Sequence, residues 1–139
     1  MEERRNPVRR RAGVLTFALC AAGLPSAAAA QACELPPGTR VESERMAVSY
    51  RTVPAKIAVG EHFVVELAAC PKRGTTFPKG VKLNALMPEH RHGMNYLPEV
   101  KQLGPGRYRS EGWMFHMPGR WEFAFDLGGE HLTHSVRIE

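Results

Sequence analysis

The sequence has few of the features that mark enzymes, nucleic-acid-binding proteins or integral membrane proteins. It contains no Ser-His-Asp or Cys-His arrangement in a recognisable context, no phosphate-binding glycine loop and no pair of catalytic carboxylates, so we expect no enzymatic activity. Its basic residues are not clustered tightly enough to indicate a nucleic-acid surface. Its apolar run at residues 13–24 has about a dozen residues, whereas a membrane-spanning helix needs about twenty.

The amino-terminal segment has the pattern of a secretory signal peptide. Five arginines precede the apolar run, and small residues follow it and end in Ala-Ala-Ala before Gln31, which is an A-x-A type of cleavage site. We therefore predict that residues 1–30 are a leader cleaved after Ala30 and that the protein is exported to the periplasm. The alternatives are a leader retained as an anchor and lipidation of Cys33. Lipidation is disfavoured because no leucine lies three residues before this cysteine.

The remaining 109 residues are nearly neutral and contain two cysteines. The leader holds five of the basic residues, which leaves 14 Lys and Arg against 12 Asp and Glu and lowers the formal net charge from +5 to +2. Cys20 lies in the leader, so Cys33 and Cys70 remain, and two cysteines outside a C-x-x-C motif in an oxidising compartment indicate a structural disulfide. The competing interpretation is that one of them is a copper thiolate. A chain of this length has room for one small domain.

Short alternating segments separated by turn residues predict an all-β domain. Residues 31–44 read as a proline-rich, extended lead-in, and residues 45–139 as the domain. The predicted strands are seven in number, at 46–53, 62–69, 81–87, 99–103, 108–115, 121–127 and 131–138. This spacing indicates an immunoglobulin-like antiparallel β-sandwich. Side chains alternate across a strand, so the core should include Trp121, Phe123 and Phe125.

Two segments hold three of the six histidines and four of the six methionines. They are Met87-Pro-Glu-His-Arg-His-Gly-Met-Asn-Tyr96 and Trp113-Met-Phe-His-Met-Pro-Gly-Arg-Trp121, and both lie at predicted strand ends. Imidazole and thioether suit copper, and thioether favours Cu(I) in particular, whereas Mg, Ca and Mn prefer oxygen ligands. The first segment should form a loop that turns sharply at Gly93. If the sandwich brings the two turns together, the side chains that would hold copper are His92, Met94, His116 and Met117, with His90 as a further candidate.

Other interpretations of these segments remain open. Glu89 and Glu111 could serve zinc, although zinc has no use for methionine. A blue-copper centre requires a cysteine thiolate, which is missing from this region. Met87 and Met114 are expected to fill the core, because thioethers pack irregular space well. The other three histidines are expected to be structural or surface residues: His62, His131 and His134. Without a metal, His-Gly-Met and His-Met-Pro-Gly would simply hold two turns against each other.

Several motifs resemble the YtkA-like domain family. They are Met87-Pro-Glu-His-Arg-His-Gly-Met94, Gly104-Pro-Gly-Arg-Tyr108, Glu111-Gly112 and Phe115-His-Met-Pro-Gly-Arg-Trp121, and the resemblance covers roughly residues 59–139. Its members are small exported or membrane-attached β-sandwich domains akin to the FixH proteins of respiratory-oxidase assembly. The resemblance implies a sandwich fold and a link to copper handling or metalloenzyme maturation in the envelope. This chain departs from the FixH pattern because no spanning helix is expected after the leader.

The sequence therefore predicts an exported, metallochaperone-like copper-binding domain. Its expected partners are a copper ion and an envelope cuproenzyme or oxidase-assembly protein. The alternative is an immunoglobulin-like interaction module without metal, which would dock on an envelope partner through Arg91, Tyr96 and Trp113 at the same loop end. Fold alone does not choose between the two, since sandwiches host many functions.

Overall fold

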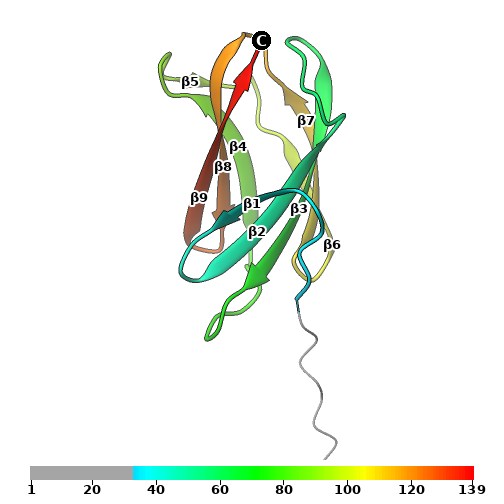
Figure 1. The fold of residues 1–139 in the computed structure, drawn as a ribbon, viewed down its shortest axis with the longest axis vertical. Helices are drawn as coiled ribbons and strands as arrows, with labels where there is room; N and C mark the ends of the chain where they lie inside the picture. Colours follow the sequence, from blue (N-terminus) through cyan, green and yellow to red (C-terminus); the bar gives the residue numbers. More distant parts are fainter. Residues whose placement is uncertain (1–32) are drawn as a thin grey trace, which may run out of the picture. The chain divides into compact units, whose positions relative to one another are not determined.

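Nine β-strands form two antiparallel sheets in the computed structural model, which describes residues 33–139 (Figure 1). The strands are β1 (Thr39–Glu42), β2 (Met46–Val53), β3 (His62–Pro71), β4 (Val81–Met87), β5 (His92–Gly93), β6 (Glu99–Gly104), β7 (Arg107–Met114), β8 (Gly119–Leu127) and β9 (Glu130–Ile138). The predicted leader, residues 1–30, and its cleavage site lie outside the described residues. Within residues 33–139, no helix has both the length and the apolar character that crossing a bilayer requires.

The order of the strands is that of an immunoglobulin-like sandwich. One sheet has the order β1-β2-β3-β7-β6 and the other has the order β5-β4-β8-β9. Without the short strands β1 and β5, these sheets reproduce the A-B-E-D and C-F-G arrangement of a seven-stranded immunoglobulin domain. The predicted fold class is therefore confirmed. All seven predicted strands are present, with ends that differ by at most two residues from the prediction.

Two further strands, β1 and β5, lie where the sequence predicted a lead-in and a loop. β1 pairs with β2, with Val41 opposite Val48, and the turn between them is closed by Ser43, whose Oγ accepts a hydrogen bond from the Met46 amide at 3.1 Å. β5 pairs with the end of β4, with Met87 opposite His92. Strands of four and two residues are too short to show alternation. They form because a neighbouring strand already offers unpaired backbone groups.

The core is built from large aromatic side chains on the facing strands of the two sheets. The β8 residues Trp121, Phe123 and Phe125 are all 0% exposed, as the sequence predicted, whereas Asp126 is exposed. From the opposite sheet, Trp113 on β7 packs against Phe123 with ring centroids 5.3 Å apart. Alternation along β8 thus places its three aromatic residues in the core, whereas on β7 the alternation shifts by one residue between Ser110 and Trp113.

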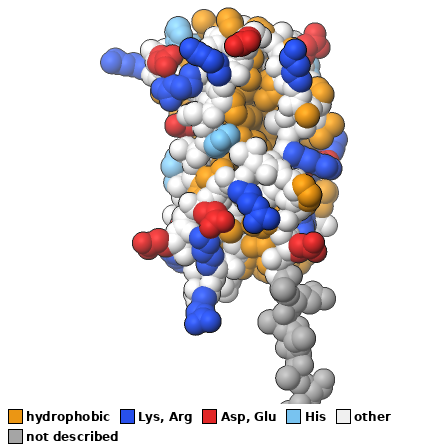
Figure 2. Space-filling model, viewed as in Figure 1, with side chains coloured by type: hydrophobic (Ala, Val, Ile, Leu, Met, Phe, Trp, Pro, Cys, Tyr) orange, Lys and Arg blue, Asp and Glu red, His pale blue; other side chains and the backbone are white. Residues whose placement is uncertain are grey.

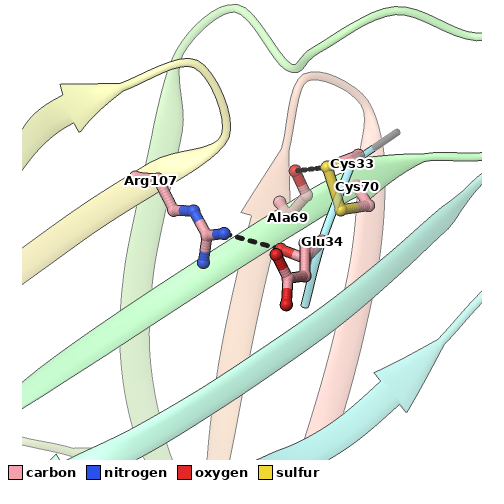
Figure 3. Close-up of a disulfide and its surroundings, with 5 residues drawn as sticks. All are labelled: Cys33, Glu34, Ala69, Cys70 and Arg107. Atoms are coloured by element: carbon pink, nitrogen blue, oxygen red, sulfur yellow. Dashed lines mark hydrogen bonds between the residues drawn. A yellow bond between two sulfur atoms is a disulfide. The ribbon is translucent and has the colours of Figure 1, made fainter. Parts of the chain in front are cut away.

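A disulfide fastens the segment that precedes β1, as Figure 3 shows. Cys33 and Cys70 are bonded, with their Cα atoms 5.5 Å apart, so the predicted disulfide is confirmed and neither sulfur is a free thiolate ligand. Two hydrogen bonds hold the same segment. Arg107 Nη2 donates to the carbonyl oxygen of Glu34 at 2.6 Å, and Ser49 Oγ donates to that of Pro36 at 2.7 Å. The part of the predicted lead-in before β1 is therefore bonded to its sheet at several points.

Candidate metal site

The two His/Met segments meet at one end of the sandwich. The first connects β4 to β6 and contains β5, and the second connects β7 to β8, which lie in different sheets. β4 ends at Met87, and Pro88 begins a turn in which the His90 amide donates to the Met87 carbonyl at 3.1 Å. Arg91 adopts the left-handed conformation with φ 56°, and the chain then returns along β4 as β5. This return directs His92 back over the end of its own sheet.

Gly93 is needed for a different reason from the one that the sequence suggested. The sharp turn was expected at Gly93, but the left-handed residue is Arg91, two positions earlier. A Cβ atom added to Gly93 would lie 3.0 Å from the carbonyl oxygen of Ala85. Gly93 therefore allows β5 to approach β4 closely, which sets the position of His92 beside it.

Three imidazole rings lie in series across this end of the molecule. The ring centroids of His92 and His116 are 5.3 Å apart, with an angle of 31° between the ring planes. The exposed ring of His90 lies on the other side of His92, with a centroid separation of 5.7 Å. The fold therefore brings together histidines that are 24 positions apart in the sequence.

Each of the two inner histidines has a nitrogen that is free to bind a ligand. His92 Nδ1 lies 3.1 Å from the carbonyl oxygen of Gly93, so a neutral His92 donates its Nδ1–H there and keeps a lone pair on Nε2. His116 Nδ1 is buried and has no hydrogen-bond partner among the described residues. A buried nitrogen of this kind costs stability unless something binds it. The Nδ1 atom of His116 is thus the buried nitrogen that lacks a hydrogen-bond partner.

The candidate methionines lie next to these histidines but have contacts of their own. Met94 and Met117 are half-buried and pack against the hydrophobic core. The carbonyl oxygen of Met117 accepts a hydrogen bond from Trp121 Nε1 at 3.0 Å, which fixes the connection between β7 and β8. Met87 is 0% exposed, which confirms its expected place in the core. The two partly buried thioethers therefore have a packing role, and each lies within two residues of His92 or His116 in the sequence.

The carboxylates that were considered as zinc ligands are engaged in ion pairs. Glu89 Oε1 lies 3.1 Å from Arg120 Nε, and Glu111 Oε1 lies 2.9 Å from Arg109 Nε. Arg109 lowers the pKa of Glu111, through its hydrogen bond first of all. In the described part of the chain, no three His, Cys, Asp or Glu side chains group together in a way that could hold a metal ion. A site here would combine the imidazoles with thioether sulfur.

Trp121 is a member of this cluster that the sequence assigned to the core alone. Its ring centroid lies 5.5 Å from that of His116 and 6.2 Å from that of His92, with angles of 81° and 74° between the ring planes. Phe115 stacks on the indole at 4.3 Å, with an angle of 8°. The spacing His-Met-Pro-Gly-Arg-Trp, in which a short turn separates His116 from Trp121, was the available sequence signal.

The docking residues of the alternative function are only partly available. Trp113 is 0% exposed, and its Nε1 donates to Ser110 Oγ at 2.9 Å, so the expectation that it contacts a partner is wrong. It faces inward with Phe63, its buried partner in the β3–β7 ladder, because directly paired residues of neighbouring strands share one face of the sheet. Tyr96 and Leu97 beside the site are 47% and 75% exposed.

The other histidines are not part of the ring cluster, although His62 lies opposite Met114 in the β3–β7 ladder. His62 is exposed, and His131 Nδ1 lies 2.6 Å from Asp126 Oδ1. His134 contacts the buried Tyr50, whose hydroxyl lies 2.7 Å from His134 Nδ1. Burial raises the pKa of Tyr50 well above its ordinary value, so the phenol keeps its proton and donates it to this nitrogen. His134 thus has a structural bond that sequence reasoning did not identify.

A groove of about 430 Å³ lies away from the histidine cluster, between β2 and β9. Figure 2 shows hydrophobic side chains exposed between the two sheets on this face of the molecule. The groove is bordered by Arg51, Lys56, Arg137 and Glu139, and Arg51 is already paired with Glu66 at 2.6 Å. Its mixed charges favour no single class of ligand.

The chain was compared with protein-family models, with curated proteins and with solved structures, and none of them matches it. No relative therefore assigns a role to the histidine cluster, and the chemistry of its residues is what indicates a function.

Proposed function

We propose that this protein is an exported copper-binding domain of the metallochaperone type, with His92 and His116 as the central ligands. The observation that carries the proposal is the 5.3 Å separation of these two rings together with the unpartnered, buried Nδ1 of His116. Buried polar atoms in folded proteins are nearly always hydrogen-bonded, and an exception calls for an explanation such as a bound ion. A copper ion would supply the missing partner.

The separation of the rings fits one shared ion. A metal bound by an imidazole nitrogen at about 2 Å lies about 3 Å from the centre of that ring. Two imidazoles on one ion, at angles between tetrahedral and linear, then hold their centres about 5 to 6 Å apart. The measured 5.3 Å falls in this range. His92 would bind through Nε2 because its Nδ1–H is directed to the Gly93 carbonyl oxygen.

The remaining candidate ligands favour copper over harder metals. Met94 and Met117 are half-buried and lie within two residues of His92 and His116 in the sequence, and thioether sulfur selects Cu(I) over Mg, Ca or Mn. His90 lies next to His92 but is exposed, which suits a residue that receives or passes on the ion rather than one that retains it. The donor set would therefore hold copper without a cysteine.

The cellular role follows from the predicted leader and from the resemblance to YtkA-like domains. Export would place the domain in the periplasm, where an envelope cuproenzyme or an oxidase-assembly protein would receive the metal. Export has a direct test: protein recovered from the periplasm should begin at Gln31 by intact-mass spectrometry. A chain that keeps its first thirty residues would contradict the cleavage.

The decisive experiment is a Cu(I) competition titration of the protein against a chromophoric chelator. The test variant carries alanine at His92, Met94, His116 and Met117. The control variant carries alanine at His62 and His131, which removes two exposed imidazoles outside the cluster. We expect one tight equivalent in the wild-type protein and in the control, and its loss in the test variant, with circular dichroism showing that all three proteins are folded. A wild-type protein that takes up no Cu(I) against the chelator refutes the proposal.

A second candidate function is a metal-free interaction module. It is favoured by one observation: Leu97, at 75% exposure, lies beside Tyr96 on the same loop, and exposed apolar side chains often mark contact sites. Such a module would be indifferent to copper, and replacing Leu97 with Ser would abolish co-purification of its partner. Copper-dependent co-purification would instead favour the chaperone.

A further inference from the structure

The structure assigns a third component to this site, and the inference rests on the copper-binding function proposed above. We infer that the indole face of Trp121 forms a wall of the site and selects a monovalent soft cation, Cu(I) or Ag(I), over Cu(II) and Zn(II).

The three rings lie close enough together to border one ion. Their centroids are separated by 5.3 Å for His92 and His116, 5.5 Å for His116 and Trp121, and 6.2 Å for His92 and Trp121. The position equally distant from the three ring centres lies about 3.3 Å from each of them. An ion at that position would be well within about 6 Å of the indole centre, which is the range of a cation–π contact. The same position also matches the distance of about 3 Å from an imidazole centre to a bound metal.

The angles between the rings agree with this arrangement. The planes of His116 and His92 stand at 81° and 74° to the indole plane. A nitrogen lone pair lies in the plane of its imidazole, so rings that stand nearly upright on the indole can direct a nitrogen to a position over its face. Phe115 stacks on the indole in the parallel orientation, at 4.3 Å, and therefore covers one of its faces. His92 and His116 contact the same indole, so an ion held between the two imidazoles would border it.

The chemistry of this wall explains the expected selectivity. Trp has the strongest cation–π attraction of the aromatic side chains, and that attraction grows when the cation is desolvated. Trp121 is 0% exposed, so its indole excludes water from one side of the site. A monovalent soft ion is satisfied by two or three nitrogen and sulfur ligands and loses little when water is excluded. Cu(II) and Zn(II) need further ligands, which the indole prevents from approaching.

The test compares Trp121→Phe with Trp113→Phe, which changes the other tryptophan of the chain. Trp113 is equally buried, at 0% exposure, and packs on Phe63 and Phe123. Affinity for Cu(I) is measured by anaerobic competition, and affinities for Ag(I) and Zn(II) by calorimetry. We expect Trp121→Phe to weaken Cu(I) and Ag(I) binding about 3- to 30-fold, the equivalent of a partly desolvated cation–π contact, and to leave Zn(II) binding unchanged. Trp113→Phe should preserve all three affinities.

A fluorescence measurement covers the case in which Trp121→Phe does not fold. In Trp113→Phe the sole indole is Trp121, and Ag(I) should change its emission with the same midpoint as in calorimetry. Binding of Ag(I) that leaves the Trp121 emission unaltered, or Zn(II) that binds more tightly than Ag(I), would overturn the inference while the copper-binding function stands. Absence of any Cu(I) or Ag(I) binding to the wild-type protein would overturn both.

Discussion

Replacing His116 with Phe should stabilise the metal-free protein while abolishing the copper binding that we propose. The unpartnered Nδ1 of His116 is buried, and its ring packs edge-on against Trp121 at 5.5 Å. A phenyl ring can keep that edge-on contact but has no polar atom to leave unsatisfied. The substitution therefore separates the stability of the fold from the requirements of the site.

The size of the effect follows from the burial of this one nitrogen. A buried polar group without a hydrogen bond costs about 1 to 3 kcal/mol. The side chain of His116 as a whole is only half-buried, so the lower end of this range applies. We expect a gain of about 1 kcal/mol in the free energy of unfolding, or a rise of about 4 °C in Tm for a domain of this size.

The assay is urea denaturation at pH 7, with a chelator and again with excess Cu(I). Copper at a hundred times its Kd should stabilise the wild-type protein by about 2.7 kcal/mol, and His116→Phe should show almost none of this gain. His134→Phe is the matched control, because it removes a histidine nitrogen that is bonded to Tyr50 at 2.7 Å. That control should lose about 1 kcal/mol, since the buried hydroxyl is left without its acceptor.

The opposite order of stabilities would refute the reasoning. If metal-free His116→Phe were less stable than the wild-type protein by 1 kcal/mol or more, the nitrogen would be satisfied in solution and His116 would be a structural residue. If His116→Phe kept the full stabilisation by copper, the ion would be held elsewhere on the domain.

Three further predictions concern the framework that supports the site. Replacing Cys33 with Ser and Cys70 with Ala should lower the free energy of unfolding, measured in urea, by about 3 to 4 kcal/mol, because the disulfide closes a loop of 37 residues. A loss below about 1 kcal/mol would contradict the loop-entropy argument. Burial raises the pKa of Tyr50, so above about pH 10 the unfolded chain releases a proton that the folded protein retains, and the free energy of unfolding should fall with rising pH. Tyr50→Phe should flatten this alkaline slope in thermal melts. An unchanged slope would contradict the role of Tyr50. Gly119→Ala should lower the free energy of unfolding by about 1 to 3 kcal/mol and weaken Cu(I) binding. Gly119 has φ +127°, and a Cβ atom there would lie 2.9 Å from Met87 Cε. A variant with wild-type stability and affinity would show that the turn adapts.

The local pattern of the chain was sufficient to predict most of the strands. The alternation over 46–53 and 81–87 reproduces the bounds of β2 and β4, because a strand that buries one face repeats every two residues. The disulfide also followed from the sequence, since the predicted export leaves two cysteines and only one possible pairing. β1 and β5 were missed because their short segments take their structure from a neighbouring strand rather than from their own residues.

The arrangement of the candidate site depended on the tertiary structure more than the strands did. The residue types of the two turns indicated soft-metal chemistry, but the approach of His92 to His116 depends on a crossing from one sheet to the other. The same packing placed Trp113 inside the core and left it unable to dock, although the sequence placed it beside exposed loop residues. It also placed Trp121 in contact with both imidazoles.

By itself, then, the sequence determined the sandwich, its aromatic core, its disulfide and the kinds of ligand at one end, because these depend on local periodicity and composition. Only the tertiary structure decided which rings meet, which nitrogen of His116 lacks a partner and which aromatic ring borders the imidazoles. The physical reason is that distances between side chains on separate sheets are fixed by how the sheets pack. That packing depends on the whole core rather than on any one segment.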